Sequence, residues 1–183
     1  MSGVSLKKFV LPGFAAIVAA SAALAATNEP TTTPAYANAL TKLDADDYVR
    51  HANEVFSLAD QDGSGTLDQD EHQALAIVQA ELARLNGFVS ISIDGEAATV
   101  ALPDEAAREL SEAERARIGA VATRQFFQAA GSDGALDRSE FASFEMERFL
   151  SADANRNGVL KSKELTRFAT QLALAPSGKA ASV

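Results

Sequence analysis

The feature that most limits what this chain can fold into is a run of twelve residues from Asp60 to Glu71. Oxygen-bearing side chains stand at positions 1, 3, 5 and 9 of the run, glycine at position 6, an aliphatic residue at position 8 and glutamate at position 12. Glycine tolerates the backbone conformation of a sharp turn. The run therefore predicts a tight loop lined with oxygen atoms, at which the preceding helix ends.

A second run, from Asp153 to Glu164, repeats the first and last positions, with asparagine at positions 3 and 5, Gly158 at position 6 and an aliphatic residue at position 8. Phe56 and Phe149 each stand four residues before the first Asp of their run, on the helix predicted to lead into it. Two such runs in 183 residues are far beyond what average residue usage gives by chance. We therefore interpret them as two loops of one kind.

A hard cation such as calcium is bound by six to eight oxygen atoms, which a tight loop can supply from alternate residues. Both runs resemble the calcium-binding loops of the EF-hand family, with Ser64 where Asp or Asn is commoner. The resemblance implies Ca²⁺ as cofactor, backbone carbonyl ligands at position 7, and closure of each site by both oxygens of the final glutamate. The implied metal-ligating residues are Asp60, Asp62, Ser64, Thr66, Asp68 and Glu71 in the first loop and Asp153, Asn155, Asn157, Val159 and Glu164 in the second.

A weaker copy lies at residues 129–140. It keeps the pattern at positions 5, 6, 8, 9 and 12 but has Ala129 and Gly131 where positions 1 and 3 should supply oxygen. Losing two side-chain ligands costs most of the affinity for calcium. We interpret it as a degenerate loop that kept its shape. The residues Ser111 to Glu114 form a capping box that predicts the start of the helix before it.

Only twelve residues, 141–152, separate the last two loops, which is enough for one helix of roughly 18 Å. Loops 129–140 and 153–164 should then lie at opposite ends of this helix and cannot pair with each other. Loop 60–71 becomes the candidate partner of one of them, and the sequence does not say which.

Residues 88–102 break the helical pattern. Apolar and polar residues alternate from Phe88, Asp94 and Gly95 form a strong two-residue turn, and a second strand-like stretch follows. A decayed fourth loop around Gly95 competes with this interpretation but would need Ala101 at its closing position. We therefore expect a mainly α fold of EF-hand helix–loop–helix units with a small inserted β-hairpin at about 88–102. The domain should span 44–175, with Asp44 capping its first helix.

The N-terminal residues differ from the rest of the chain. Lys7 and Lys8 precede an uncharged stretch from Phe9 to Ala26, and this order is typical of a secretory signal peptide. We expect a signal peptide at 1–26, disordered segments at 27–43 and 176–183, and a periplasmic or secreted protein. The alternative is an uncleaved anchor in the inner membrane at residues 9–26, the one case in which we expect contact with a membrane.

Composition excludes several functional classes. The absence of Cys rules out disulfides, zinc ribbons and iron–sulfur clusters, and a net charge of -9 argues against nucleic acid as a partner. His51 and His72 lack metal-ligand spacing and are predicted to be surface residues of helices, and no catalytic constellation is present, so we expect no enzyme. The favoured function is calcium sensing or buffering. The alternative is a structural, adhesion or scaffold protein stabilised by calcium, and any protein partner stays unidentified.

Overall fold

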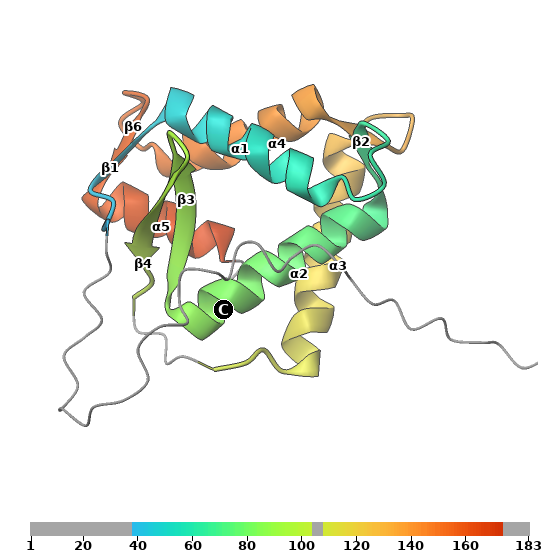
Figure 1. Cartoon of the computed structure of the whole chain (residues 1–183), viewed down its shortest axis with the longest axis horizontal. Coiled ribbons are helices and arrows are strands. Elements are labelled where there is room, and N and C mark those ends of the chain that lie inside the picture. The colour runs from blue at the N-terminus through green and yellow to red at the C-terminus, as the bar shows by residue number, and fades with distance from the viewer. Residues whose placement is uncertain (1–37, 104–107, 174–183) are drawn as a thin grey trace, which may run out of the picture. The chain divides into compact units, whose positions relative to one another are not determined.

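The computed structural model describes residues 38–103 and 108–173. Within these residues, helices and short strands alternate along the chain (Figure 1). The helices are α1 (Ala45–Ala59), α2 (Gln69–Asn86), α3 (Glu112–Ala129), α4 (Arg138–Ala152) and α5 (Ser162–Leu172). The strands are β1 (Lys42–Asp44), β2 (Thr66–Leu67), β3 (Phe88–Ile93), β4 (Glu96–Ala101), β5 (Leu136–Asp137) and β6 (Val159–Lys161). This confirms the mainly α fold with helix–loop–helix units and an inserted hairpin.

Local sequence determines where most helices start. α2, α3 and α4 each begin with a capping box, in which the side chain before the helix accepts from a backbone N–H and a glutamate reaches back to the N-cap. The box predicted at Ser111 and Glu114 is confirmed. The prediction for α1 was wrong in one respect: Asp44 stands at the N-cap but makes no capping bond. Its carboxylate accepts instead from Lys42 Nζ, at 2.9 Å.

The described residues form three antiparallel strand pairs, two of which connect distant parts of the chain. β2 pairs with β5, so that Leu67 lies opposite Leu136, and β1 pairs with β6, so that Leu43 lies opposite Leu160. Loop 60–71 is therefore paired with loop 129–140. Loop 153–164 is paired with the segment that precedes α1. In Figure 1, α1 and α4 run along one side of the molecule, with β1 and β6 at one end of them and β2 at the other.

The predicted hairpin is formed by β3 and β4. Asp94 and Gly95 at its turn have φ angles of 53° and 82°, the left-handed conformations that a tight hairpin turn requires at both central residues. Ile91 and Val100 turn inward and are buried. They complete a core cluster formed around β1, β6 and α5, so the hairpin is part of the packed domain.

Within the part of the chain that the structure describes, buried side chains form three clusters. The first surrounds Leu160 and Phe168 and includes Ile91 of the hairpin. The second surrounds Phe56, Phe126 and Phe141 beside loops 60–71 and 129–140. The third is a small, alanine-rich contact between α2 and α3. The two larger clusters lie against opposite ends of α1 and α4, because each of these helices contributes aromatic rings to both.

Secondary structure begins earlier than expected. Of the stretch 27–43, predicted to be a linker, residues 42–43 belong to β1, and Asn38 and Leu40 exchange backbone hydrogen bonds with Thr99 at 3.0 and 2.8 Å. Residues 1–37 and 174–183 lie outside the described residues, and with them the expected signal peptide at 1–26 and tail at 176–183. Among the described helices, none has the length and apolar character needed to cross a membrane.

Candidate metal centre

Loop 60–71 begins where α1 ends. Asp60 closes the last helical turn by donating its backbone N–H to the carbonyl of Phe56 at 3.0 Å. Gly65 then takes a φ of 85°, which turns the chain into β2, and Asp68 caps α2. The two helices and the short strand pair thus hold both ends of the loop and its middle.

Three carboxylates converge inside this loop. Oxygen atoms of Asp60, Asp62 and Glu71 lie within 4.8 Å of one another. Asp60 Oδ2 accepts from the backbone N–H of Gly65 at 3.0 Å, whereas Asp60 Oδ1 is buried and has no hydrogen-bond partner. Like charges this close repel each other, and a buried acceptor without a donor is costly. A bound cation would relieve both problems.

The remaining predicted ligands of the first loop lie around this cluster. Glu71 reaches across the loop, accepting from Gln61 N at 2.8 Å and from Asp68 N at 3.1 Å. Ser64 Oγ donates to the carbonyl oxygen of Thr66 at 2.9 Å, so these two predicted ligands are in contact. Asp68 stands slightly apart, because its carboxylate caps α2 by accepting from Glu71 N at 2.8 Å.

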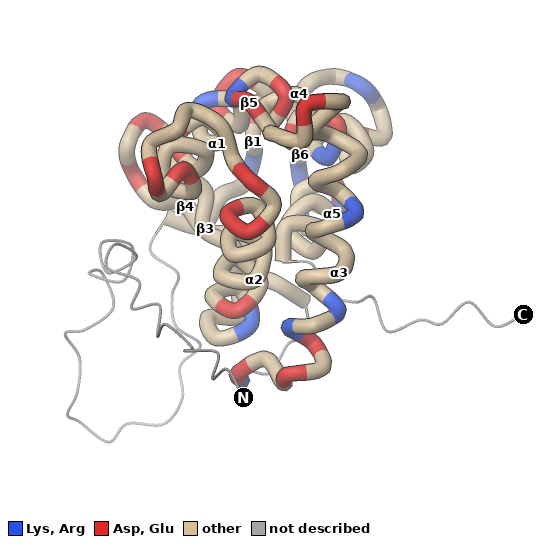
Figure 2. The backbone as a smooth tube through the Cα atoms, turned by 90° about the vertical axis from the view of Figure 1, so that its right-hand side faces the viewer, with Lys and Arg blue, Asp and Glu red and all other residues tan. Residues whose placement is uncertain are grey.

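Hydrogen bonds favour the ionised form of Asp62. The side chain and backbone N–H of Ser64 lower the pKa of Asp62 below its usual value. Figure 2 shows that several acidic residues are grouped in the upper half of the molecule, around α1, β5 and the loops beside them. The loop therefore holds an acidic cluster of oxygen atoms.

Loop 153–164 has the same backbone hydrogen-bonding pattern. Asp153, like Asp60, accepts from the glycine at position 6, here Gly158 N at 2.8 Å. Glu164, like Glu71, accepts from the backbone N–H of the loop's second residue, here at 3.1 Å. Asn155 and Asn157 each accept from the backbone N–H two residues further on, at 3.1 and 2.8 Å. The structure thus brings the predicted side chains of this loop together.

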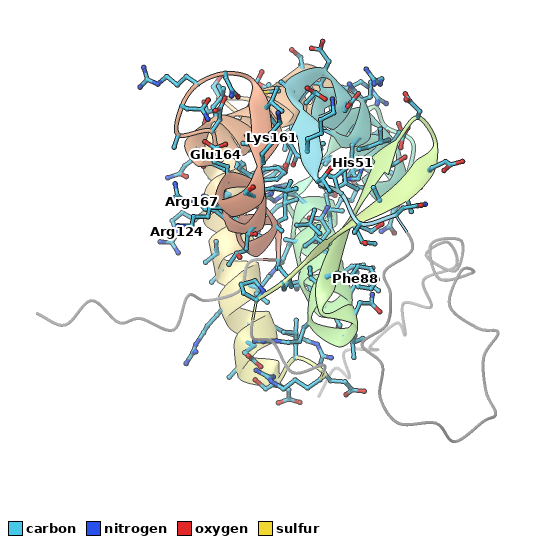
Figure 3. All side chains as sticks on the ribbon, turned by 90° about the vertical axis from the view of Figure 1, so that its left-hand side faces the viewer. His51, Phe88, Arg124, Lys161, Glu164 and Arg167 are labelled. Carbon is cyan, nitrogen blue, oxygen red and sulfur yellow. The ribbon has the colours of Figure 1, made fainter. Side chains whose placement is uncertain are left out.

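The two loops differ in charge. Loop 153–164 has two carboxylates, and one of them, Glu164, accepts a hydrogen bond from the side-chain amide of Asn155 at 3.0 Å. Asp153 is only 2% exposed, and both of its oxygens accept backbone hydrogen bonds. Lys161, at position 9, projects on the same side of the molecule as Glu164 (Figure 3). A cation would meet less negative charge here than in loop 60–71.

The interpretation of residues 129–140 as a twelve-residue loop needs a correction. α3 continues through Ala129, and Ala130 is the residue that closes its last turn, donating to Phe126 O at 2.8 Å. Asp60 and Asp153 do the same in the other two loops, so Ala130 is their counterpart. From this residue to the final glutamate the chain is one residue shorter, because only residues 130–140 remain. This loop therefore lacks two side-chain ligands and is one residue shorter than the other two loops.

The histidines are less exposed than predicted. His72 is 4% exposed, and its ring packs between those of Phe126 and Phe144. His51 is partly buried and its Nδ1 accepts from the backbone N–H of Ser92 at 3.1 Å. The expectation of surface positions was wrong because each histidine lies on the face of its helix that packs against other elements of the domain. Neither joins the carboxylate cluster within the described residues.

Comparison with known proteins agrees with this geometry. A sequence model of the family described as EF hand matches residues 53–76, which cover the end of α1, the whole of loop 60–71 and the start of α2. Residues 53–76 are therefore identified as an EF hand. No curated protein and no solved structure matches the sequence.

The matched EF hand is the one that contains the carboxylate cluster. EF hands are typically calcium-binding units without enzymatic activity, and the oxygen-lined loop is the part of the unit that would hold the ion. Loops 129–140 and 153–164 lie outside the matched range. Their assignment depends on the structural correspondence with the EF hand at 53–76.

Proposed function

We propose that this EF-hand protein is an exported, non-enzymatic calcium-binding protein with two sites, one in loop 60–71 and one in loop 153–164. The observation that carries the proposal is the convergence of Asp60, Asp62 and Glu71, together with the buried and unpartnered Oδ1 of Asp60. A dication with many oxygen ligands fits this arrangement, since it offsets the repulsion and occupies the free oxygen.

The donors proposed for each site are oxygen atoms alone. In the first site these are the carboxylates of Asp60, Asp62, Asp68 and Glu71, the hydroxyl of Ser64 and the carbonyl of Thr66. In the second they are Asp153, Asn155, Asn157 and Glu164 with the carbonyl of Val159. Hard oxygen ligands in a flexible loop favour Ca²⁺ over softer transition metals, and Mg²⁺ would demand a stricter octahedral shell.

We propose that the first site binds more tightly. It has four carboxylates against two, and Lys161 and Lys163 add positive charge beside the second site. Greater ligand charge tightens calcium binding, and a nearby cation opposes it. For a protein outside the cytoplasm, about 0.1–1 mM is the starting expectation for the dissociation constant, with the first site at or below that range.

Calorimetric titration of the purified chain with Ca²⁺ tests the assignment of sites. Glu71→Gln should abolish the tighter phase, and Glu164→Gln should abolish the weaker one. Glu140→Gln in the degenerate loop is the matched control and should change neither. Loss of a full binding equivalent in Glu140→Gln would show that the three loops have been ranked wrongly.

Export is proposed from the basic start and the uncharged residues 9–26. Mass spectrometry of the protein from its native host should find an N-terminus between Ala26 and Asn38. Recovery of chains that start at Met1 in the membrane fraction would instead support a protein anchored in the inner membrane by residues 9–26.

We propose a sensing or buffering role. One observation favours the alternative, in which calcium stabilises the fold. The hairpin residues Ile91 and Val100 already fill the apolar cluster beside loop 153–164, and β6 of that loop holds β1. Calcium titration with a hydrophobic dye and circular dichroism separates the two roles. A sensor gains dye binding with calcium and keeps its helices without it, whereas a structural site loses helix content when calcium is removed.

A further inference from the structure

The positively charged side chains of this domain fall into a paired and an unpaired group. From Lys42 to Arg115, every described Lys and Arg forms an ion pair with a carboxylate. Within the residues that the structure describes, five exposed cations further along the chain form no ion pair: Arg117, Arg124, Lys161, Lys163 and Arg167. In a chain with 25 acidic residues, cations left without acidic neighbours indicate a surface of its own kind.

Two of these cations lie on the outer face of α3. Arg117 and Arg124 are seven residues apart, which is close to two helical turns, so both project from the same face. Phe127 follows three residues later and is 61% exposed. α3 has no acidic residue after Glu114. The outer face of this helix therefore combines positive charge with an exposed aromatic ring.

The other three cations lie at the end of β6 and on α5. Lys163 and Arg167 are four residues apart on one face of α5, and Lys161 directly precedes this helix. Glu164 is the only acidic residue of α5. In Figure 3, Lys161, Arg167 and Arg124 project on the same side of the molecule, and Figure 2 shows α3 and α5 on one side. We call the five cations together with Phe127 the basic face.

Phe127 indicates which anionic partner suits the basic face. Its ring packs edge-on against the buried ring of Phe126, with ring centroids 5.5 Å apart, and this contact holds it at the surface beside Arg124. At a lipid bilayer, basic side chains attract anionic headgroups, while an aromatic ring enters the boundary between headgroups and acyl chains. A soluble anionic polysaccharide would contact the cations and leave the ring in water. The combination therefore favours a bilayer.

The net charge of -9 does not prevent this contact. At physiological ionic strength, charges more than about 8 Å apart are largely screened from each other in water. A bilayer that touches the basic face is therefore influenced mainly by the five cations there. A second copy of the chain is a poorer partner, because it brings another net charge of -9.

We infer that the basic face docks on the surface of an anionic phospholipid bilayer, with Phe127 at the headgroup boundary. The domain lies on the membrane in this arrangement and does not cross it. Each Lys or Arg close to an anionic leaflet strengthens binding by roughly 5-fold. None of the five cations is a proposed calcium ligand, so this docking does not depend on calcium binding.

Vesicle flotation of the full chain tests the docking. The vesicles consist of phosphatidylcholine alone or of phosphatidylcholine with about one third phosphatidylglycerol, and a calcium chelator prevents bridging of headgroups by the ion. The chain should bind the anionic vesicles more tightly than the neutral ones, and added salt should weaken this preference. The uncharged residues 9–26 are common to both measurements, so the difference between the two kinds of vesicle is the quantity of interest.

Single substitutions assign the surface. Arg124→Gln and Arg167→Gln should each weaken binding to the anionic vesicles by about 5-fold. The matched control is Arg50→Gln, which removes the same charge from an exposed arginine that is paired with Asp47, and it should change binding little. Phe127→Ala should weaken binding by about 5-fold as well, because the ring no longer enters the headgroup boundary. Its control is Leu58→Ala, at an apolar position of α1 that is 53% exposed.

Several results would overturn the docking. Equal binding to neutral and anionic vesicles would do so, and so would a preference for anionic vesicles that survives Arg124→Gln and Arg167→Gln. Binding to heparin that these substitutions weaken, without binding to vesicles, would assign the basic face to a soluble polyanion. Self-association in analytical ultracentrifugation that the same substitutions abolish, again without vesicle binding, would assign it to a second copy of the chain.

Discussion

His51 shows how one side chain can hold two elements together. It belongs to α1, and its Nδ1 accepts the backbone N–H of Ser92 in β3, so the ring must be neutral at that nitrogen (Figure 3). Burial lowers its pKa, and the negative charges of Glu145 and Glu54 oppose this effect only in part. Protonation would both remove the acceptor and place a cation in a buried position.

This gives a pH prediction. The unfolded chain binds the proton with an ordinary pKa of about 6.5, and the folded chain binds it less readily. The free energy of unfolding should therefore fall as the pH drops below about 6.5, and His72, whose pKa burial also lowers, should add to the slope. Urea unfolding at pH 5.5 and 7.5, with a calcium chelator present, measures this difference.

His51→Asn is the matched variant, because its amide oxygen can take the place of Nδ1 without titrating. It should reduce the difference in unfolding free energy between the two pH values and leave the remainder due to His72. An unchanged difference in this variant would show that His51 does not contribute.

Sequence and structure agree at some residues and differ at others for physical reasons. The converging side chains of loop 60–71 could be foreseen, because the spacing of ligands in a tight turn is a local property. The burial of His72 could not, since it depends on Phe126 and Phe144 from other helices. Asp44 has the sequence of a cap, but Lys42, two residues earlier in the same strand, competes for its carboxylate.

At the scale of elements, the loop at residues 129–140 keeps the strand and the helix cap of the motif, although its turn is one residue shorter. Its strand still pairs with β2, and Asp137 and Glu140 still cap α4. The extra helical residue at Ala129 removes one residue from the turn. Counting motif positions along the sequence cannot detect this change, because α3 continues past the residue at which the loop was expected to begin.

A gain-of-function test follows from this. By sequence pattern alone, Ala129→Asp combined with Gly131→Asp restores the missing ligands. In the structure, Ala129 lies within α3 and the loop is one residue short, so the double variant should gain no calcium equivalent in a calorimetric titration. A third binding equivalent would show that the loop can adopt the full twelve-residue form.

The hairpin and the strand pair β1–β6 differ in how well the sequence indicates them. Asp94-Gly95 between alternating residues is a strong local signal, and the hairpin was found where it was expected. β1 has only Leu43 as a large apolar residue, and its pairing is imposed by Leu160 more than a hundred residues away. Long-range pairing of so short a strand cannot be predicted from a single sequence.

At the scale of the whole molecule, helices α1 and α4 connect the two larger core clusters. Tyr48 and Phe56 of α1 enter different core clusters, and so do Phe141 and Phe149 of α4. If one cluster lost its packing, the aromatic rings of α1 and α4 in it would be released. Both helices also supply rings to the other cluster. The two clusters should therefore unfold in one cooperative transition.

Leu160→Ala tests this. Leu160 is 0% exposed, and its truncation should lower the free energy of unfolding by about 2–5 kcal/mol. Circular dichroism and tyrosine fluorescence should still report one common urea transition. Leu150→Ala, at a position that is 54% exposed, is the matched control and should change stability by about 0.5 kcal/mol or less. Two separate transitions in the Leu160 variant would contradict the shared framework.

The hydrogen bonds made along the edges of the hairpin affect the tendency of the protein to aggregate. An isolated two-stranded ribbon offers unpaired backbone groups on which a neighbouring chain can template intermolecular β-structure. Here the outer groups of Thr99 are taken by residues 38–40, and on the opposite edge the N–H of Ser92 is taken by His51. Each edge thus has outward backbone groups that are bonded by the chain's own atoms. Conditions that free them, such as acid acting on His51, are those under which aggregation of this protein should begin.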